Sequence, residues 1–193
     1  MKKPELLAPA GDFEKLRTAI HYGADAVYLG DSRFSLRGKA GNFEPEELKE
    51  AIKYAHARNK KAYVTVNIFP HNSDLKGMEE YIRFLKEAKP DAVILSDPGF
   101  FMMFKKNAPE IAIHVSTQAN ITNSEAARFW ETLGAKRLVL SRELTIDEIK
   151  DIRSKVKIEL EVFVHGSICI SYSGRCYISS FLTSRSANRG ECT

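Results

Sequence analysis

Short runs of consecutive apolar residues, many of them β-branched, alternate along the chain with longer amphipathic stretches. The runs predict strands at residues 5–8, 26–29, 62–66, 92–95, 112–115, 137–140 and 160–164. Between the runs, apolar residues recur every three or four positions, as in Phe13, Leu16 and Ile20, which predicts a helix in each interval. The alternation indicates an α/β protein with about seven parallel strands, six helices and right-handed crossovers.

Residues that often cap helix N-termini stand before several of the amphipathic stretches. They are Asp12, Ser73, Ser124 and Thr145. Thr145 is followed three positions later by Glu148, a spacing that predicts a capping box.

The connection after the first predicted strand argues against a dinucleotide-binding sheet. The stretch Ala10-Gly11-Asp12 is too short for a Gly-rich phosphate loop. We therefore expect a TIM-type (β/α) barrel that is incomplete after its seventh strand. Residues 1–168 are expected to form the barrel portion, and residues 169–193 a cysteine-containing loop segment that leads into a missing C-terminal part.

Polar residues follow the predicted strands, at the ends where a TIM-type barrel carries its chemistry. The candidates at these ends are Asn67, Gln118, Asn120, Arg142 and His165. Each one alone is better explained as a cap or turn residue, whereas together they predict a polar rim around one mouth. Glu161 lies within the last predicted strand. It either faces a helix or points into the barrel and pairs with a cation such as Arg142, because a buried unpaired carboxylate is costly.

All three cysteines of the chain, Cys169, Cys176 and Cys192, lie within the last 25 residues. Their spacing matches neither a zinc ribbon nor a ferredoxin run, so spacing alone leaves three unrelated thiols as an alternative. Soft sulfur ligands suit zinc or an iron–sulfur cluster. A nucleophilic thiol activated by His165 or Arg175 is the competing interpretation.

Composition and charge limit the class of protein. With 44% hydrophobic and 28% charged residues, the chain has the balance of a soluble globular protein. It contains no signal peptide and no run of the ~20 apolar residues that cross a membrane, so we expect a cytoplasmic protein. The reducing cytoplasm disfavours structural disulfides. The net charge of +4 permits a nucleic-acid partner without requiring one.

Basic and aromatic residues gather near the predicted mouth. They include Arg37 and Arg175, with aromatic residues interleaved at Phe34, Tyr172, Tyr177 and Phe181. Cations that hold phosphates beside rings that stack on bases predict a surface for single-stranded RNA. The same arginines equally suit a small dicarboxylate.

The segment from Glu161 to Ser179 resembles the signature of the collagenase-like peptidase family U-32. That signature is Glu-x-Phe-x-x-Gly-Ser/Ala-aliphatic-Cys followed by Gly-x-Cys-x-aliphatic-Ser, and every position is matched. Residues 66–72, 118–120, 140–144 and 172–176 are similar to the tRNA hydroxylation branch of the family.

The resemblance implies an RNA-modifying enzyme that converts the wobble uridine of tRNA to 5-hydroxyuridine without O₂, with prephenate as the hydroxyl donor. It implies that Cys169, Cys176 and Cys192 bind a 4Fe–4S cluster whose fourth ligand lies beyond residue 193. The candidate catalytic residues are then His165, Arg142 and Glu161, and the candidate substrate-binding residues are Asn67, Gln118, Asn120, Arg37 and Arg175.

Two other functions remain open from the residues. One is a collagenase-like peptidase that uses a cysteine with His165, although no protease constellation is visible. The other is a non-catalytic scaffold that binds tRNA through its basic face. The oligomeric state is not indicated by the sequence.

Overall fold

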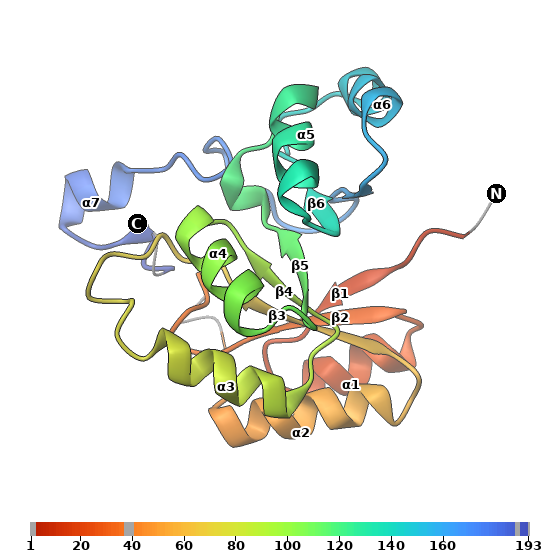
Figure 1. Ribbon diagram of the computed structural model, residues 1–193, viewed down its shortest axis with the longest axis vertical. Helices are drawn as coiled ribbons and strands as arrows, with labels where there is room; N and C mark the ends of the chain where they lie inside the picture. The colour runs from red at the N-terminus through yellow and green to blue at the C-terminus, as the bar shows by residue number, and fades with distance from the viewer. Residues whose placement is uncertain (1–2, 37–40, 188–189, 193) are drawn as a thin grey trace.

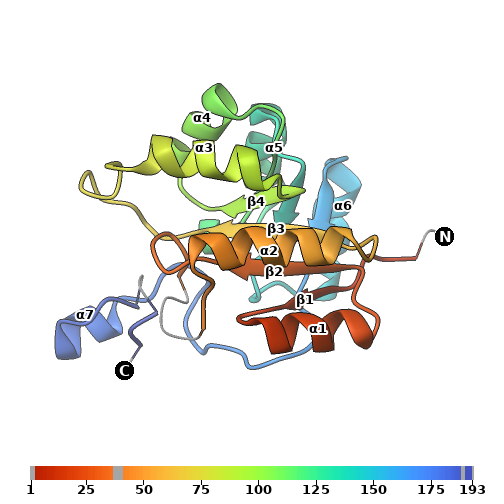
Figure 2. The same cartoon turned by 90° about the horizontal axis from the view of Figure 1, so that it is seen from below.

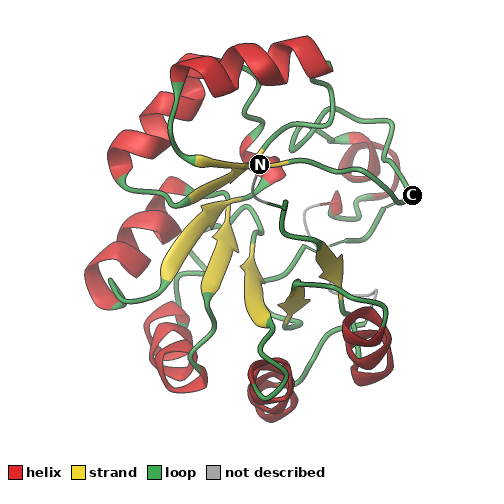
Figure 3. Cartoon of the chain, turned by 90° about the vertical axis from the view of Figure 1, so that its right-hand side faces the viewer, coloured by secondary structure: helices red, strands yellow, loops and turns green. Residues whose placement is uncertain are grey.

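The computed structural model describes residues 3–36, 41–187 and 190–192. Its strands form one parallel sheet in chain order, curled into a half barrel with the helices on the outside (Figure 3). The strands are β1 (Leu7–Pro9), β2 (Ala26–Gly30), β3 (Lys61–Val66), β4 (Ala92–Leu95), β5 (Ala112–Val115), β6 (Arg137–Val139) and β7 (Glu159–Glu161). The seven predicted parallel strands are thereby confirmed.

One helix follows each of the first six strands, as the alternating pattern predicts. These helices are α1 (Phe13–His21), α2 (Pro45–His56), α3 (Met78–Ala88), α4 (Pro98–Asn107), α5 (Ser124–Leu133) and α6 (Ile146–Lys155). A short 3₁₀ helix, η1 (Thr117–Ala119), lies between β5 and α5, and a further helix, α7 (Ile178–Thr183), follows β7. The sequence did not predict α7, because this helix is too short to show a helical period of apolar residues.

Two of the predicted helix caps are confirmed and two are displaced. Asp12 Oδ1 accepts a hydrogen bond from the backbone N–H of Lys15 at 2.8 Å, and Thr145 forms the expected capping box. Ser73 is not a cap, because α3 begins after Gly77. Ser124 is the first residue of α5, and Asn123 caps that helix instead. These shifts leave the order of strands and helices unchanged.

Apolar side chains cover both faces of the sheet. The outer face and the helices share the main core, to which Leu16, Leu48 and Phe100 contribute fully buried side chains. The inner face carries a smaller cluster that consists of Ala26, Tyr63, Ala92 and Ile94. Because both faces are covered, the central strands are continuous apolar runs rather than alternating ones.

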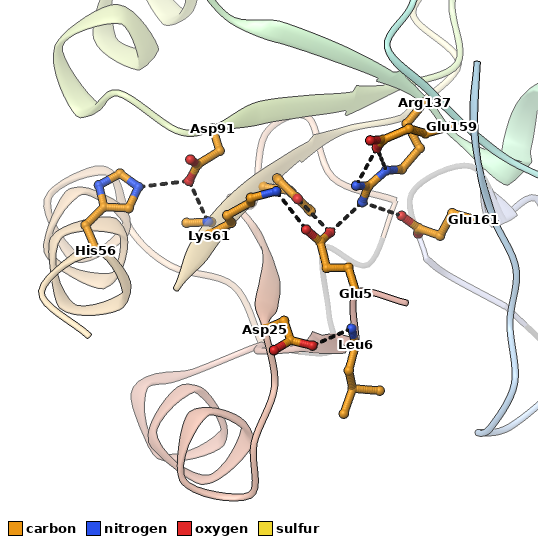
Figure 4. Close-up of polar contacts among 11 residues, drawn as sticks. Glu5, Leu6, Asp25, His56, Lys61, Asp91, Arg137, Glu159 and Glu161 are labelled. Atoms are coloured by element: carbon orange, nitrogen blue, oxygen red, sulfur yellow. Dashed lines mark hydrogen bonds and ion pairs between the residues drawn. The ribbon is translucent and has the colours of Figure 1, made fainter. Parts of the chain in front are cut away.

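A network of charged side chains ties the amino ends of the strands together (Figure 4). Arg137, at the start of β6, donates hydrogen bonds to Glu5 at 2.7 Å, to Glu159 at 2.8 Å and to Glu161 at 3.2 Å. Glu5 precedes β1 and also accepts a hydrogen bond from Lys61. The network thus links the first and the last strands of the half barrel.

Burial opposes ionisation of Glu5, but the hydrogen bonds from Arg137, Lys61 and Tyr63 outweigh it and lower the pKa of Glu5 from 4.5 to about 2. Glu5 therefore carries its negative charge throughout the neutral range. In TIM-type folds the amino end of the barrel contributes stability rather than chemistry.

The last strand is shorter than the sequence predicts. The expected strand at residues 160–164 is β7 (Glu159–Glu161), because β6 offers only three residues for pairing. Beyond it, Val162, Phe163 and Val164 are exposed. The chain then continues to α7 at the carboxyl end of the strands, far from the N-terminus in both views (Figures 1 and 2). No helix within the described residues is long and apolar enough to cross a membrane.

Candidate functional site

The cysteine segment, residues 169–176, is fixed to the chain connections that follow β5 and β6. Its central residue, Ser173, is fully buried. The backbone N–H and the hydroxyl of Ser173 both donate to the carboxylate of Glu143, the hydroxyl at 3.0 Å. The hydroxyl of Thr117 lies 3.4 Å from the Ser173 hydroxyl on its other side. Residues beyond two neighbouring strand ends therefore hold one serine of the segment.

Arg142 binds the same segment through its guanidinium group. Its Nη2 donates to the carbonyl oxygen of Ser171 at 2.8 Å, its Nε donates to the hydroxyl of Ser173 at 3.2 Å, and its Nη1 donates to the carbonyl oxygen of Cys169. Burial opposes ionisation of Glu143, but hydrogen bonds from Ser173 and the charge of Arg142 lower its pKa. Arg142 and Glu143 are adjacent in sequence, and both side chains contact Ser173.

The segment also contacts the connection after β5. Gly174 has φ +69°, and a Cβ at this position would clash with the carbonyl oxygen of Gln118. Nε of Arg175 donates to Oδ1 of Asn120 at 3.3 Å. The structure therefore brings together three of the candidate substrate-binding residues, Gln118, Asn120 and Arg175.

The remaining candidate substrate-binding residues lie after β2 and β3. Oδ1 of Asn67 accepts a hydrogen bond from the backbone N–H of Leu36 at 3.0 Å, so this side chain orders the β2 connection. Arg37 lies outside the described residues.

The predicted aromatic RNA surface is correct only in part. Phe34 is buried and packs on Tyr81 with ring centroids 4.8 Å apart, so it is a core residue. Tyr172, Tyr177 and Phe181 are exposed. The accessible rings thus belong to the cysteine segment and α7, whereas the ring after β2 does not take part.

The candidate catalytic residues occupy separate environments. Glu161 pairs with a cation, as one of the two alternatives expected, but this cation is Arg137 in the charged network and not Arg142. Burial raises the pKa of Glu161, and the charge of Arg137 opposes this effect. His165 is exposed and lies beyond the end of β7, so the prediction that it ends a strand is also wrong. Of the three, only Arg142 contacts the cysteine segment.

The three thiols differ in their surroundings. Cys176 is partly buried, and its sulfur accepts hydrogen bonds from the Ser171 side chain and from backbone N–H groups at the start of α7, which lowers its pKa. Cys169 and Cys192 are exposed, and all three are free thiols. No three His, Cys, Asp or Glu side chains of the described residues lie close enough to bind one metal ion. The sulfur donors suit a soft metal, but within the described part of the chain the three thiols are not gathered at one point.

A surface hollow of about 410 Å³ lies beside Cys176. It is lined by Phe69, His71, Gly174, Arg175, Cys176, Tyr177, Ser180, Ser186 and Ala187. A second hollow, of about 530 Å³, lies between the start of α5 and one side of α6 and carries none of the candidate site residues. The first hollow is thus the cavity associated with the candidate site.

A parallel half barrel with polar side chains gathered beyond its strand ends belongs to the TIM-type (β/α) class. The fold is similar to that of the U32 peptidase Mk0906, with a TM-score of 0.71 and 16% sequence identity, over 84% of this chain and 70% of that one. At this identity the likeness shows the fold alone. The chain belongs to peptidase family U32, whose sequence profile matches residues 11–193.

Two relatives have names that refer to RNA. The tRNA hydroxylation protein P of Escherichia coli (strain K12) is 48% identical over 194 residues, which cover 100% of this chain and 43% of that protein. The 23S rRNA 5-hydroxycytidine C2501 synthase of the same organism is 40% identical over 189 residues, which cover 98% of this chain and 28% of that protein. The chain spans less than half the length of either relative. The resemblance inferred from the sequence is confirmed.

Sequence reasoning missed the importance of Glu143 and Ser173. Glu143 directly follows Arg142, and Ser173 lies between the first two cysteines. A carboxylate next to an arginine at a strand end was the available signal. It gave no indication that both side chains turn toward one distant serine.

Proposed function

We propose that the protein acts as an enzyme that hydroxylates RNA, with tRNA as its substrate. The observation that carries the proposal is the match of 98% or more of this chain to relatives named for tRNA hydroxylation and for 5-hydroxycytidine formation in rRNA. The matched region includes the cysteine segment with its contacts to Arg142 and Glu143. A tRNA substrate implies a cytoplasmic location.

The finer form of the proposal is oxygen-independent conversion of the wobble uridine to 5-hydroxyuridine, linked to prephenate. The chemistry of the cysteine segment supports RNA binding. Arg175 offers a cation for phosphate, and the exposed rings of Tyr172 and Tyr177 offer faces for base stacking. Gln118 and Asn120 lie beside Arg175 and supply polar groups for a small molecule or a base.

A 4Fe–4S cluster on Cys169, Cys176 and Cys192 is also part of the proposal. The lowered pKa of Cys176 favours the thiolate that such a cluster requires. Cluster binding would require the exposed thiols of Cys169 and Cys192 to approach Cys176, together with a fourth ligand from elsewhere. Anaerobic reconstitution should give broad visible absorbance that a Cys169→Ala variant loses. A colourless, iron-free wild-type protein after reconstitution would contradict this part.

Mass spectrometry of tRNA nucleosides tests the function. A strain that lacks the gene should lose 5-hydroxyuridine derivatives, and a plasmid copy of the gene should restore them. Unchanged nucleosides combined with salt-dependent tRNA binding would indicate a scaffold instead. Gelatin cleavage that is sensitive to Cys176→Ala would indicate a peptidase.

A further inference from the structure

Three features of the structure could carry a further function. They are the hollow beside Cys176, the charged network at the amino ends of the strands, and the contacts that Arg142 and Glu143 make with the cysteine segment. The hollow belongs to the site already described, and the network has the position of a stabilising element. The contacts of Arg142 and Glu143 lead further, because they relate two strand-end residues to the conformation of the cysteine segment.

We propose that Arg142 and Glu143 are positioning residues that hold the backbone between Cys169 and Cys176 in one conformation, and that neither side chain binds substrate. The resemblance to the family implies a catalytic role for Arg142. The contacts of its side chain point to another role.

The guanidinium of Arg142 is directed at the segment itself. Each of its three nitrogen atoms donates to an acceptor there, two of which are backbone carbonyl oxygens, at Cys169 and Ser171. A planar guanidinium fixes the relative positions of the acceptors it joins, which a flexible ammonium group does not. One side chain thereby defines the relative positions of the backbone at Cys169 and at Ser171 and of the Ser173 hydroxyl.

Glu143 completes the attachment from the neighbouring position. Its two carboxylate oxygens accept the N–H and the hydroxyl of Ser173, so the buried serine has both of its donors satisfied. The positive charge of Arg142 compensates the negative charge of Glu143, which allows both to approach a buried group. Gly174, the next residue, lies directly against the backbone of Gln118. The segment is thus held at Cys169, Ser171 and Ser173 and is in close contact at Gly174.

Amide hydrogen exchange measures this role directly. The informative amides are those of Ser173, which donates to Glu143, and Arg175, which donates to the carbonyl of Tyr172 at 3.1 Å. In Arg142→Met, both should exchange at least about tenfold faster than in the wild type, with amides of β2 and β3 unchanged. Arg142→Lys should show an intermediate rate, because one ammonium group cannot join three acceptors. Glu143→Gln should accelerate the Ser173 amide most.

Arg153→Met is the matched control. Arg153 also donates to backbone carbonyl oxygens, those of Val156 and Ile158, but in the connection between α6 and β7. This variant should accelerate exchange near residues 156–158 and leave Ser173 unchanged. If Arg153→Met accelerates Ser173 as much as Arg142→Met does, the effect is general loosening and the proposal is wrong.

The proposal relies on the proposed function only for its biological meaning, and the two can fail separately. Exchange is measured without RNA, so a faster Ser173 amide in Arg142→Met supports positioning whatever reaction the protein performs. A strain carrying Arg142→Met should also lose tRNA hydroxylation, and Arg142→Lys should restore part of it. Loss of hydroxylation with unchanged exchange at Ser173 would assign Arg142 to the substrate and overturn the proposal.

Discussion

Replacement of Arg137 by methionine should strongly destabilise the half barrel. Arg137 donates four hydrogen bonds: two to Glu159, one to Glu5 and one to Glu161. A hydrogen bond to a charged group contributes about 1.5–3 kcal/mol to stability. Adding four such contributions would overestimate the stability lost on replacing Arg137. The carboxylate of Glu159 is 67% exposed and regains water when Arg137 is removed, whereas those of Glu5 and Glu161 are only 21% and 20% exposed. Two largely buried carboxylates would lose their common cation.

Breaking a buried ion pair by removing one partner costs about 3–5 kcal/mol, and we expect Arg137→Met to lower the free energy of unfolding by that amount at pH 7. Urea denaturation followed by circular dichroism measures it. Arg128→Met is the control, because Arg128 pairs with Glu125 on the exposed face of α5 and should change stability by less than about 0.5 kcal/mol. A loss below about 1 kcal/mol in Arg137→Met would refute the role assigned to the network.

Three further predictions concern single residues. Burial, together with the charge of Arg137, lowers the pKa of His114 from 6.5 to about 4, so the unfolded chain binds a proton that the folded chain does not. The free energy of unfolding should therefore fall by up to about 3 kcal/mol as the pH decreases from 6.5 to 4. In His114→Gln, the dependence of this free energy on pH should be weaker in the same window. An unchanged dependence in that variant would contradict the role given to His114. Gly174→Ala should release the cysteine segment and accelerate exchange of the Ser173 amide at least about tenfold. Gly166 also has a positive φ, but nothing lies within 4 Å of an added Cβ there, so Gly166→Ala should leave this exchange unchanged. Equal effects of the two variants would argue against the contact of Gly174 with Gln118. Thr145→Ala removes the cap of α6 and should cost about 1 kcal/mol in thermal or urea unfolding, and no measurable loss would show that the capping box contributes nothing.

The fold was predictable because its signals are local and repeated. Each strand is an apolar run and each of the first six helices has an amphipathic period, so the order of elements follows from the sequence. The end of β7 was not predictable in the same way. Residues 162–164 are as apolar as a strand requires, but pairing ends where β6 ends, and that limit depends on a strand some 20 residues earlier in the chain.

The candidate site was predictable in position but less so in its contacts. Strand-end polar residues and the cysteines identified the carboxyl end of the sheet. There, Arg142 contacts the cysteine segment at Ser171, and Asn120 contacts it at Arg175. The partner of Glu161 was not predictable from the apolar pattern, because Arg137 lies on the neighbouring strand β6 and the same guanidinium also binds Glu5 from before β1. Contacts between residues distant in sequence depend on curvature, which the hydrophobic pattern does not encode.

We propose that the cysteine segment held by Arg142 and Glu143 is the functional centre of an RNA-hydroxylating protein. The most direct test is the amount of 5-hydroxyuridine derivatives in tRNA from a strain whose only copy of the gene encodes Cys176→Ser. This substitution changes one partly buried sulfur to oxygen and leaves Arg142, Glu143 and Ser173 in place. The account predicts that the modified nucleosides fall to the level of the deletion strain while the variant protein accumulates normally. Wild-type levels of these nucleosides in the Cys176→Ser strain would contradict it.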